Sequence, residues 1–247
     1  MKKKSDLKYI GRQTKLALNN FPFSYSQAHI EIVYAMADIK EAAAFAHKKA
    51  HEIDSVIADA IINACQEVKS GKFDDQFQLP GLQGGAGTSI HMNVNEVIAT
   101  RSTEILKNKK IVSANNQVNK SQSTNDVGPS ALKIVTIRLI DTLLKTLDEA
   151  GLIFEKKGLE FHGIAKLGRT HLQDAVPTTL GEEFLSYAAS IRRGRKRLEQ
   201  TRSYMFDLNL GGTAIGNMVN ASLPYRTVVY KKLSEITGFS LKPAKNL

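Results

Sequence analysis

The sequence predicts a mainly α-helical protein. Over several long stretches, apolar residues recur at three- and four-residue spacing, which is the period of one face of an α-helix. The stretch 130–150 contains neither glycine nor proline. No alternating apolar and polar run of strand length stands out, and no succession of strand and helix patterns indicates a parallel sheet. We therefore expect helices packed on helices.

The first part of the chain predicts an irregular arm followed by two helices. Residues 1–25 lack a sustained period. Residues 27–51 are rich in Ala, Ile, Glu and Lys at helical spacing and predict the first helix. A second helix is predicted over 54–70, and Gly71 can supply its left-handed C-terminal cap. The apolar face of this second helix consists of Ile57, Ile61, Cys65 and Val68.

Polar loops then alternate with longer helices. Residues 72–87 contain one proline and four glycines and predict a loop, after which 93–106 resumes helical composition. Residues 107–126 are polar and predict mostly loop. Pro129 is expected in the first turn of a helix that continues through 130–150. The apolar seam of that helix, suited to packing in a bundle, consists of Leu132, Val135, Leu139, Leu143, Leu147 and Ala150.

A last long helix is predicted over 179–206. Its start, Thr179-Leu180-Gly181-Glu182, has the spacing of a capping box, in which a hydroxyl and a carboxylate bond free backbone N–H groups. One domain boundary is predicted near residue 127, where a loop-rich half gives way to long helices. We expect an N-terminal helical domain over 1–127 and a helical-bundle domain over 128–247.

Composition excludes several classes of protein. Among 247 residues Cys65 is the only cysteine, which excludes an intramolecular disulfide framework and a zinc site built on paired thiolates. No apolar h-region follows the basic start, and nowhere do 18 apolar residues run together, so a cytoplasmic protein without a membrane segment is expected. The excess of 34 Lys and Arg over 24 Asp and Glu gives a formal net charge of +10. The basic run at 192–197 is interpreted as a solvated helix face, and no nucleic-acid partner is predicted.

Three polar clusters interrupt the helical pattern and are candidates for chemistry. The first spans 84–96 and includes Thr88 at the expected start of a helix, where free backbone N–H groups can hold an anion. The second, 118–126, offers hydroxyl and amide groups at Ser123, Thr124 and Asn125. The third, 166–177, contains Thr170 and His171. Taken singly, the clusters are better explained by loops, helix caps and structural hydrogen bonds.

Together the clusters resemble the aspartase/fumarase superfamily. The motifs GAGTSxxMNVNEVIA, VNKSQSTND and GRTHLQDAVPTTLGEEF are long, nearly uninterrupted and in the family's order. Three details favour the aspartate ammonia-lyase (aspartase) branch over class II fumarases. These are STND at 123–126 instead of SSND, AVP at 175–177 instead of ATP, and SANN at 113–116 where fumarases usually carry HPND. His91 replaces an asparagine usual in the first motif, and both altered substrate contact and harmless packing are open interpretations.

The resemblance implies reversible elimination of ammonia from L-aspartate to give fumarate, without a metal or an organic cofactor. It implies that Ser123 and Thr124 bind the β-carboxylate and that Thr170 binds the α-carboxylate. Thr88, Asn125 and His171 would contact the amino group, with His171 also tuning charge. The family's general-base serine lies in a GSSxMPxKxNP loop that is absent from these 247 residues. The resemblance covers the N-terminal half of a family member, with an incomplete bundle.

The resemblance also implies partners. Family members are homotetramers whose active sites combine motifs from different subunits, so we expect a homo-oligomer or a complementing C-terminal half, and an inactive chain when alone. A small dicarboxylate is the expected substrate. Two alternatives stay open: a class II fumarase-type hydratase, and a non-catalytic fragment that acts as a binding or structural module.

Overall fold

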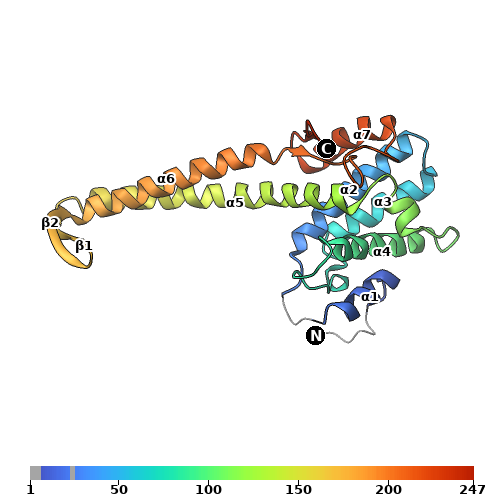
Figure 1. Cartoon of the computed structure of the whole chain (residues 1–247), viewed down its shortest axis with the longest axis horizontal. Coiled ribbons are helices and arrows are strands. Elements are labelled where there is room, and N and C mark those ends of the chain that lie inside the picture. Colours follow the sequence, from blue (N-terminus) through green and yellow to red (C-terminus); the bar gives the residue numbers. More distant parts are fainter. Residues whose placement is uncertain (1–6, 23–25) are drawn as a thin grey trace. The chain divides into compact units, whose positions relative to one another are not determined.

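The computed structural model describes residues 7–22 and 26–247, which are mainly helical (Figure 1). The chain start, where no signal peptide is predicted, lies partly outside these residues. Contacts divide the chain into two compact units. The first comprises 1–135 and 206–247, and the second comprises 136–205. The domain boundary predicted near residue 127 remains a prediction. The compact units divide after residues 135 and 205, and one continuous helix, α5 (Thr124–Glu160), contributes to both.

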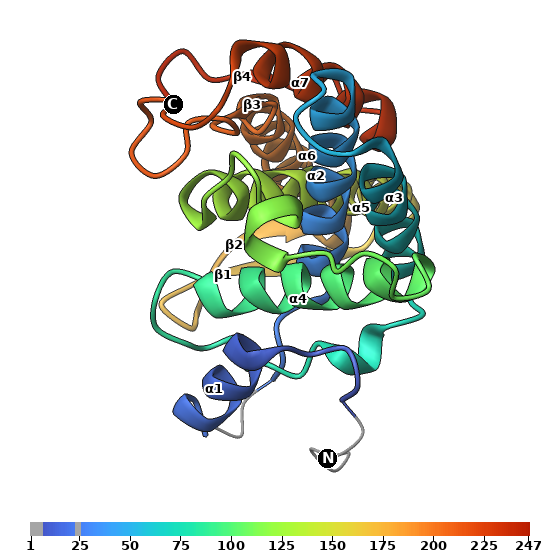
Figure 2. The same ribbon diagram turned by 90° about the vertical axis from the view of Figure 1, so that its right-hand side faces the viewer.

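The core of the first unit is built on the predicted helices α2 (Ile30–Lys49) and α3 (Ser55–Lys69), which lie side by side (Figure 2). The predicted apolar face of α3 is buried, and Gly71 has the positive φ of a left-handed cap. The helix α4 (Thr88–Ile105) contacts both α2 and α3. It begins at Thr88, the expected helix start in the first polar cluster, five residues before the stretch whose composition is helical.

Two helices of the first unit were not predicted. The first is α1 (Arg12–Asn20), in the region expected to be irregular. The Glu96 carboxylate of α4 accepts the backbone N–H groups of Gly11, Gln13 and Thr14, so α1 is fixed by a contact distant in sequence. The second is α7 (Leu223–Thr237), which packs against α2. Short elements complete the unit: a 3₁₀ turn (Asp74–Gln76), a π-helical turn (Ala114–Val118), and the two-residue parallel strands β3 (Asp207–Leu208) and β4 (Lys242–Pro243).

The prediction that Pro129 lies in the first turn of its helix is wrong, because α5 begins at Thr124. Proline has no N–H to bond the carbonyl four residues earlier, which here is that of Asn125. The Asn209 side-chain amide supplies the missing donor to this carbonyl, at 2.9 Å. A proline is therefore tolerated beyond the first turn, and the helix extends across residues predicted to be loop.

The second unit contains the remainder of α5, an antiparallel hairpin and α6 (Leu180–Tyr204). The hairpin pairs β1 (Ala165–Thr170) with β2 (Gln173–Thr179) and contradicts the expectation of no strand in this region. Its residues are mostly exposed, so the alternation that reveals a half-buried strand is absent. The predicted helix cap is confirmed at Thr179, whose hydroxyl accepts the backbone N–H of Glu182 at 3.2 Å.

Close packing and ion pairs hold α6 against this part of α5. A Cβ at Gly181 would lie 2.4 Å from the Gly158 carbonyl oxygen, so only glycine permits the observed approach. Arg192 bonds Glu155, and Arg195 bonds Asp148. Part of the basic run is thus neutralised by carboxylates of α5. The seam residues Leu139 and Leu143 remain about half exposed, at 50% and 43%. In the described part of the chain, no helix is both long and apolar enough to span a membrane.

Candidate functional site

The Ser123–Asp126 turn, at the start of α5, is held in place by the buried carboxylate of Asp126. Asp126 is fully buried, and its Oδ1 accepts the backbone N–H of Ser123 at 2.8 Å. Its Oδ2 accepts the backbone N–H groups of Gly211 at 3.0 Å and Thr213 at 3.1 Å. Burial raises the pKa of this carboxyl, against the lowering effect of the three N–H donors. Asp126 thus orients the backbone of the turn and of residues 211–213.

Asn125 is fixed at both its backbone and its side chain. Its carbonyl oxygen accepts from Asn209, and its Nδ2 donates to the carbonyl oxygen of Ala214 at 2.7 Å. With Nδ2 engaged, the side-chain Oδ1 is the atom left to accept from a ligand. An acceptor at this position suits an amino group.

Thr124 connects to a buried polar network that the sequence did not predict. Its Oγ1 lies 2.8 Å from Nδ1 of His91, and Nε2 of His91 lies 2.7 Å from Nζ of Lys40. Lys40 also donates to Oδ1 of Asn119 at 2.8 Å and to Oε1 of Gln122 at 2.9 Å. Lys40 is completely buried and His91 is 1% exposed. His91 packs in the interior, in line with one of the two open interpretations. It also contacts Thr124, a predicted site residue.

Burial governs the charge states of this network. It lowers the pKa of Lys40 to about 7, with Asp126 acting in the opposite direction. Burial also lowers the pKa of His91 well below its ordinary value, and the charge of Lys40 adds to this effect. His91 is therefore neutral around pH 7. A lysine within an otherwise helical pattern is usually solvent-exposed, and only its position among alanines and isoleucines in 27–51 could have indicated burial.

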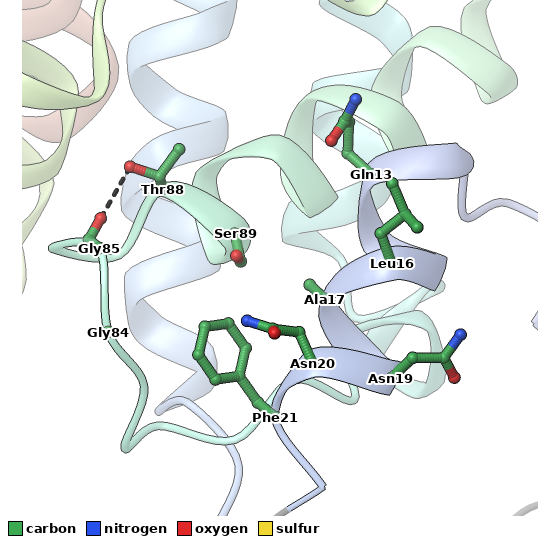
Figure 3. Close-up of a pocket in the computed structure, with 10 residues that line it drawn as sticks. All are labelled: Gln13, Leu16, Ala17, Asn19, Asn20, Phe21, Gly84, Gly85, Thr88 and Ser89. Carbon is green, nitrogen blue, oxygen red and sulfur yellow. Dashed lines mark hydrogen bonds between the residues drawn. The ribbon is translucent and has the colours of Figure 1, made fainter.

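Thr88 lies in a different cavity from the Ser123–Asp126 turn. It is the first residue of α4, is exposed, and donates its hydroxyl to the Gly85 carbonyl oxygen at 2.7 Å. An open cavity of about 850 Å³ lies where the end of α1 faces this glycine loop. Figure 3 shows the side chains that line it. Ser123 lines a second cavity, of about 500 Å³, together with residues of 213–220. Thr88 and Thr124 are nonetheless linked, because His91 lies one turn after Thr88 on α4.

Thr170 and His171 belong to the second unit, at the tip of the β1–β2 hairpin. Thr170 pairs with Gln173, which leaves His171 and Leu172 as a two-residue loop. Both loop residues have positive φ, 49° and 63°, as in the turns that commonly close hairpins, although neither is glycine or asparagine. Both are exposed. Arg169 and Asp174 form an exposed ion pair at 3.4 Å beside the loop.

The donor set suits an anion more than a metal. In residues 7–22 and 26–247, no group of three His, Cys, Asp or Glu side chains is arranged to hold a metal ion. The turn instead offers two hydroxyls, at Ser123 and Thr124, at the N-terminus of a 37-residue helix. Backbone N–H groups and the helix dipole favour negative charge there. Such an arrangement can bind a carboxylate and stabilise charge that develops on it.

Solved structures of fumarate lyases and class II fumarases share this helical fold. The structure superimposes on a fumarate lyase/delta-crystallin protein from Brucella melitensis with a TM-score of 0.87 and 42% identity, covering 97% of this chain and 53% of that one. It superimposes on a class II fumarase from Schistosoma mansoni with a TM-score of 0.88 and 32% identity, covering 96% and 54%.

Sequence comparison leads to the family. The lyase family model matches residues 2–247, and the chain belongs to this family. It is 44% identical to an aspartate ammonia-lyase of Bacillus subtilis over 243 residues, covering 97% of this chain and 51% of the relative. It is 39% identical to a class II fumarate hydratase of Campylobacter jejuni over 236 residues, covering 94% and 51%. The predicted membership of the aspartase/fumarase superfamily is confirmed. The chain spans about half the length of these curated relatives.

Proposed function

We propose that this chain supplies part of the active site of an aspartate ammonia-lyase, which interconverts L-aspartate with fumarate and ammonia. The observation that carries the proposal is the Ser123–Asp126 turn, whose polar groups are held in position by Asp126, Asn209 and His91. The identity of 44% to an aspartate ammonia-lyase supports the same substrate class.

The chemistry explains why such a turn is needed. Elimination removes a proton from the carbon beside the β-carboxylate, and the electron pair moves into that carboxylate to form an aci-carboxylate with two negative charges. The pair then returns to form the C=C bond of fumarate, and the C–N bond breaks, with its own two electrons leaving on the protonated amine as ammonia. In the proposed arrangement Ser123 and Thr124 donate hydrogen bonds to the doubly charged group. One well-placed donor of this kind contributes about 2.7–4 kcal/mol to a transition state.

Other residues divide the remaining tasks in the proposal. Asn125 accepts from the substrate amino group through its Oδ1, and Thr88 and His171 contact the same group. Thr170 binds the α-carboxylate. The hairpin that carries Thr170 and His171 is exposed, which fits the expectation that these residues complete a site with another chain. The proton-abstracting serine is expected from a GSSxMPxKxNP segment, so the assay must supply that segment.

The test is a complementation assay. The chain is incubated with L-aspartate, alone and mixed with a polypeptide that covers the remaining half of the Bacillus subtilis relative, and fumarate is followed by its ultraviolet absorbance. We expect fumarate from the mixture only. In the mixture, Ser123→Ala and Thr124→Val should each lower kcat/KM about 100-fold. Thr227→Val, which alters an exposed threonine of α7, is the matched control and should leave the rate unchanged.

The class II fumarase relative makes hydration of fumarate the second candidate. Incubating the mixture with fumarate plus ammonium, and separately with fumarate alone, separates the two activities. Aspartate from the first incubation supports the proposal. Malate without aspartate contradicts it and supports a hydratase. If neither product forms while succinate still binds, the non-catalytic binding module is favoured.

A further inference from the structure

The Lys40 ammonium has an unusual set of partners. Its nitrogen makes three hydrogen bonds, to His91, Asn119 and Gln122, and all three acceptors are uncharged side-chain atoms at 2.7–2.9 Å. An ammonium group has three donors and no acceptor. Each contact must therefore be a bond donated by Lys40, including the one to Nε2 of His91.

This donation fixes the tautomer of His91. A ring nitrogen that accepts a hydrogen bond carries no proton, so the single proton of the neutral ring lies on Nδ1. Nδ1 then donates to Oγ1 of Thr124 across the observed 2.8 Å. The opposite tautomer would set the N–H of Nε2 against an ammonium N–H, which burial makes costly.

The tautomer in turn fixes the direction of the Thr124 hydroxyl. Because Oγ1 accepts from His91, its own proton cannot point back along that bond and is turned toward another acceptor. Among the hydrogen bonds of the described residues, Thr124 Oγ1 has no second partner. Thr124 is half-buried at the first position of α5, next to Ser123, which lines the 500 Å³ cavity.

We propose that Lys40 and His91 are positioning residues that hold the Thr124 hydroxyl as a hydrogen-bond donor toward a bound carboxylate. This inference rests on the proposed function, because it takes the ligand to be a dicarboxylate. It adds two residues that touch no substrate and act only through Thr124. A preset donor costs no reorientation when negative charge grows on the carboxylate.

The same geometry makes the hydroxyl direction dependent on pH. When Lys40 loses its proton to solvent, its amine gains a lone pair and can accept from an N–H at Nε2 of His91. The His91 proton can then lie on Nε2, and Nδ1 can accept the Thr124 hydroxyl, which withdraws it from a ligand. The charged or titratable groups that act on Lys40 are His91 from α4, Asp126 from α5 and Cys65 from α3. The pKa of about 7 for Lys40 locates this change near neutral pH.

The first measurement observes the tautomer of His91 directly. Long-range proton–nitrogen correlation spectra of the ¹⁵N-labelled chain at about pH 6 report which ring nitrogen of each histidine is protonated. The His91 signal is identified by its loss in His91→Asn. We expect neutral His91 with the proton on Nδ1, and a shift toward the Nε2 tautomer in Lys40→Met. A wild-type His91 protonated on Nε2 would overturn the inference.

The second measurement is the affinity for succinate. It is made on the chain alone or on the chain with the complementing half, whichever binds succinate better. His91→Gln keeps an acceptor near Lys40 but does not reach Thr124, and should weaken binding about tenfold, as Thr124→Val should. His91→Asn carries an amide near the Nδ1 position and should stay within about threefold, as should Thr124→Ser.

The double variant separates positioning from general damage. If His91 acts only through Thr124, adding His91→Gln to Thr124→Val should cause no further loss, whereas an independent structural role would multiply the two losses. Multiplied losses, or equal affinity for wild type, His91→Gln and Thr124→Val, would overturn the inference and leave the proposed function standing. If the wild-type protein binds succinate neither alone nor with the complementing half, the inference and the proposed function are both overturned.

Discussion

Two of the regions that carry predicted site residues differ in what holds them. The Ser123–Asp126 turn rests on a buried carboxylate and a buried histidine and lysine, which bond it to α2, α4 and the segment 209–214. The β1–β2 hairpin, with Thr170 and His171, is mostly exposed and held by its own ladder. Isolated hairpins are marginally stable in water. Motifs of similar length in the sequence therefore differ in whether the chain itself fixes their geometry.

Replacing one aspartate in each region tests this difference most strongly. Asp126→Ala leaves three backbone N–H groups without an acceptor, two of them buried, and should lower the free energy of unfolding by about 4 kcal/mol. Asp174→Ala removes only an exposed ion pair with Arg169 and should cost less than about 0.5 kcal/mol. Urea denaturation followed by circular dichroism measures both. Equal losses would mean that the two regions are supported alike.

The pH dependence of stability tests the buried network behind the Ser123–Asp126 turn. The pKa of Lys40 is about 7 in the folded protein and 10.5 ordinarily. Between these values the unfolded chain holds the proton and the folded chain does not, so the free energy of unfolding rises with pH. We expect a rise of about 2 kcal/mol between pH 7 and pH 9 in wild type relative to Lys40→Met. Parallel curves for the two proteins would contradict the burial of an ionisable lysine.

The smallest effect is expected at Leu172, in the exposed β1–β2 hairpin. Its φ of 63° is unfavourable for a side chain with a Cβ, and its side chain is 93% exposed. Leu172→Gly should therefore stabilise the hairpin by about 0.5–1 kcal/mol, since no packing is lost. Leu167→Gly, within strand β1, should destabilise it by a similar amount. Amide hydrogen exchange of the β1–β2 ladder measures both, and faster exchange in Leu172→Gly would contradict the prediction.

The sequence predicted those parts of the fold that have a local signal. Helices α2, α3 and α6 have apolar residues at helical spacing, and α3 and α6 have recognisable caps at Asp54 and Thr179. The hairpin has no such signal, because neither of its faces is buried in this chain. For helix α1 the signal is distant in sequence, because the Glu96 carboxylate bonds the first backbone N–H groups of this helix.

The candidate site divides in the same way. Ser123, Thr124 and Asn125 could be singled out because their motif is contiguous. Lys40 could not, since its partners come from segments 51 to 82 residues away, and a single lysine in a helical pattern resembles a surface residue. His91 was noticed only as a departure from the family motif. Its contact with Thr124 required the packing of α4 against the start of α5.

The bonds from residues 125 and 126 to residues 209–214 also bear on the order of events during synthesis. These contacts span 84 to 89 positions of the chain. A growing chain can form α2, α3 and α4 from nearby contacts, but the turn at Ser123 cannot close until residue 214 has left the ribosome. Contacts between distant residues form slowly because a long loop must first be closed. The Ser123–Asp126 turn is thus expected to be among the last parts of its unit to assemble on the ribosome.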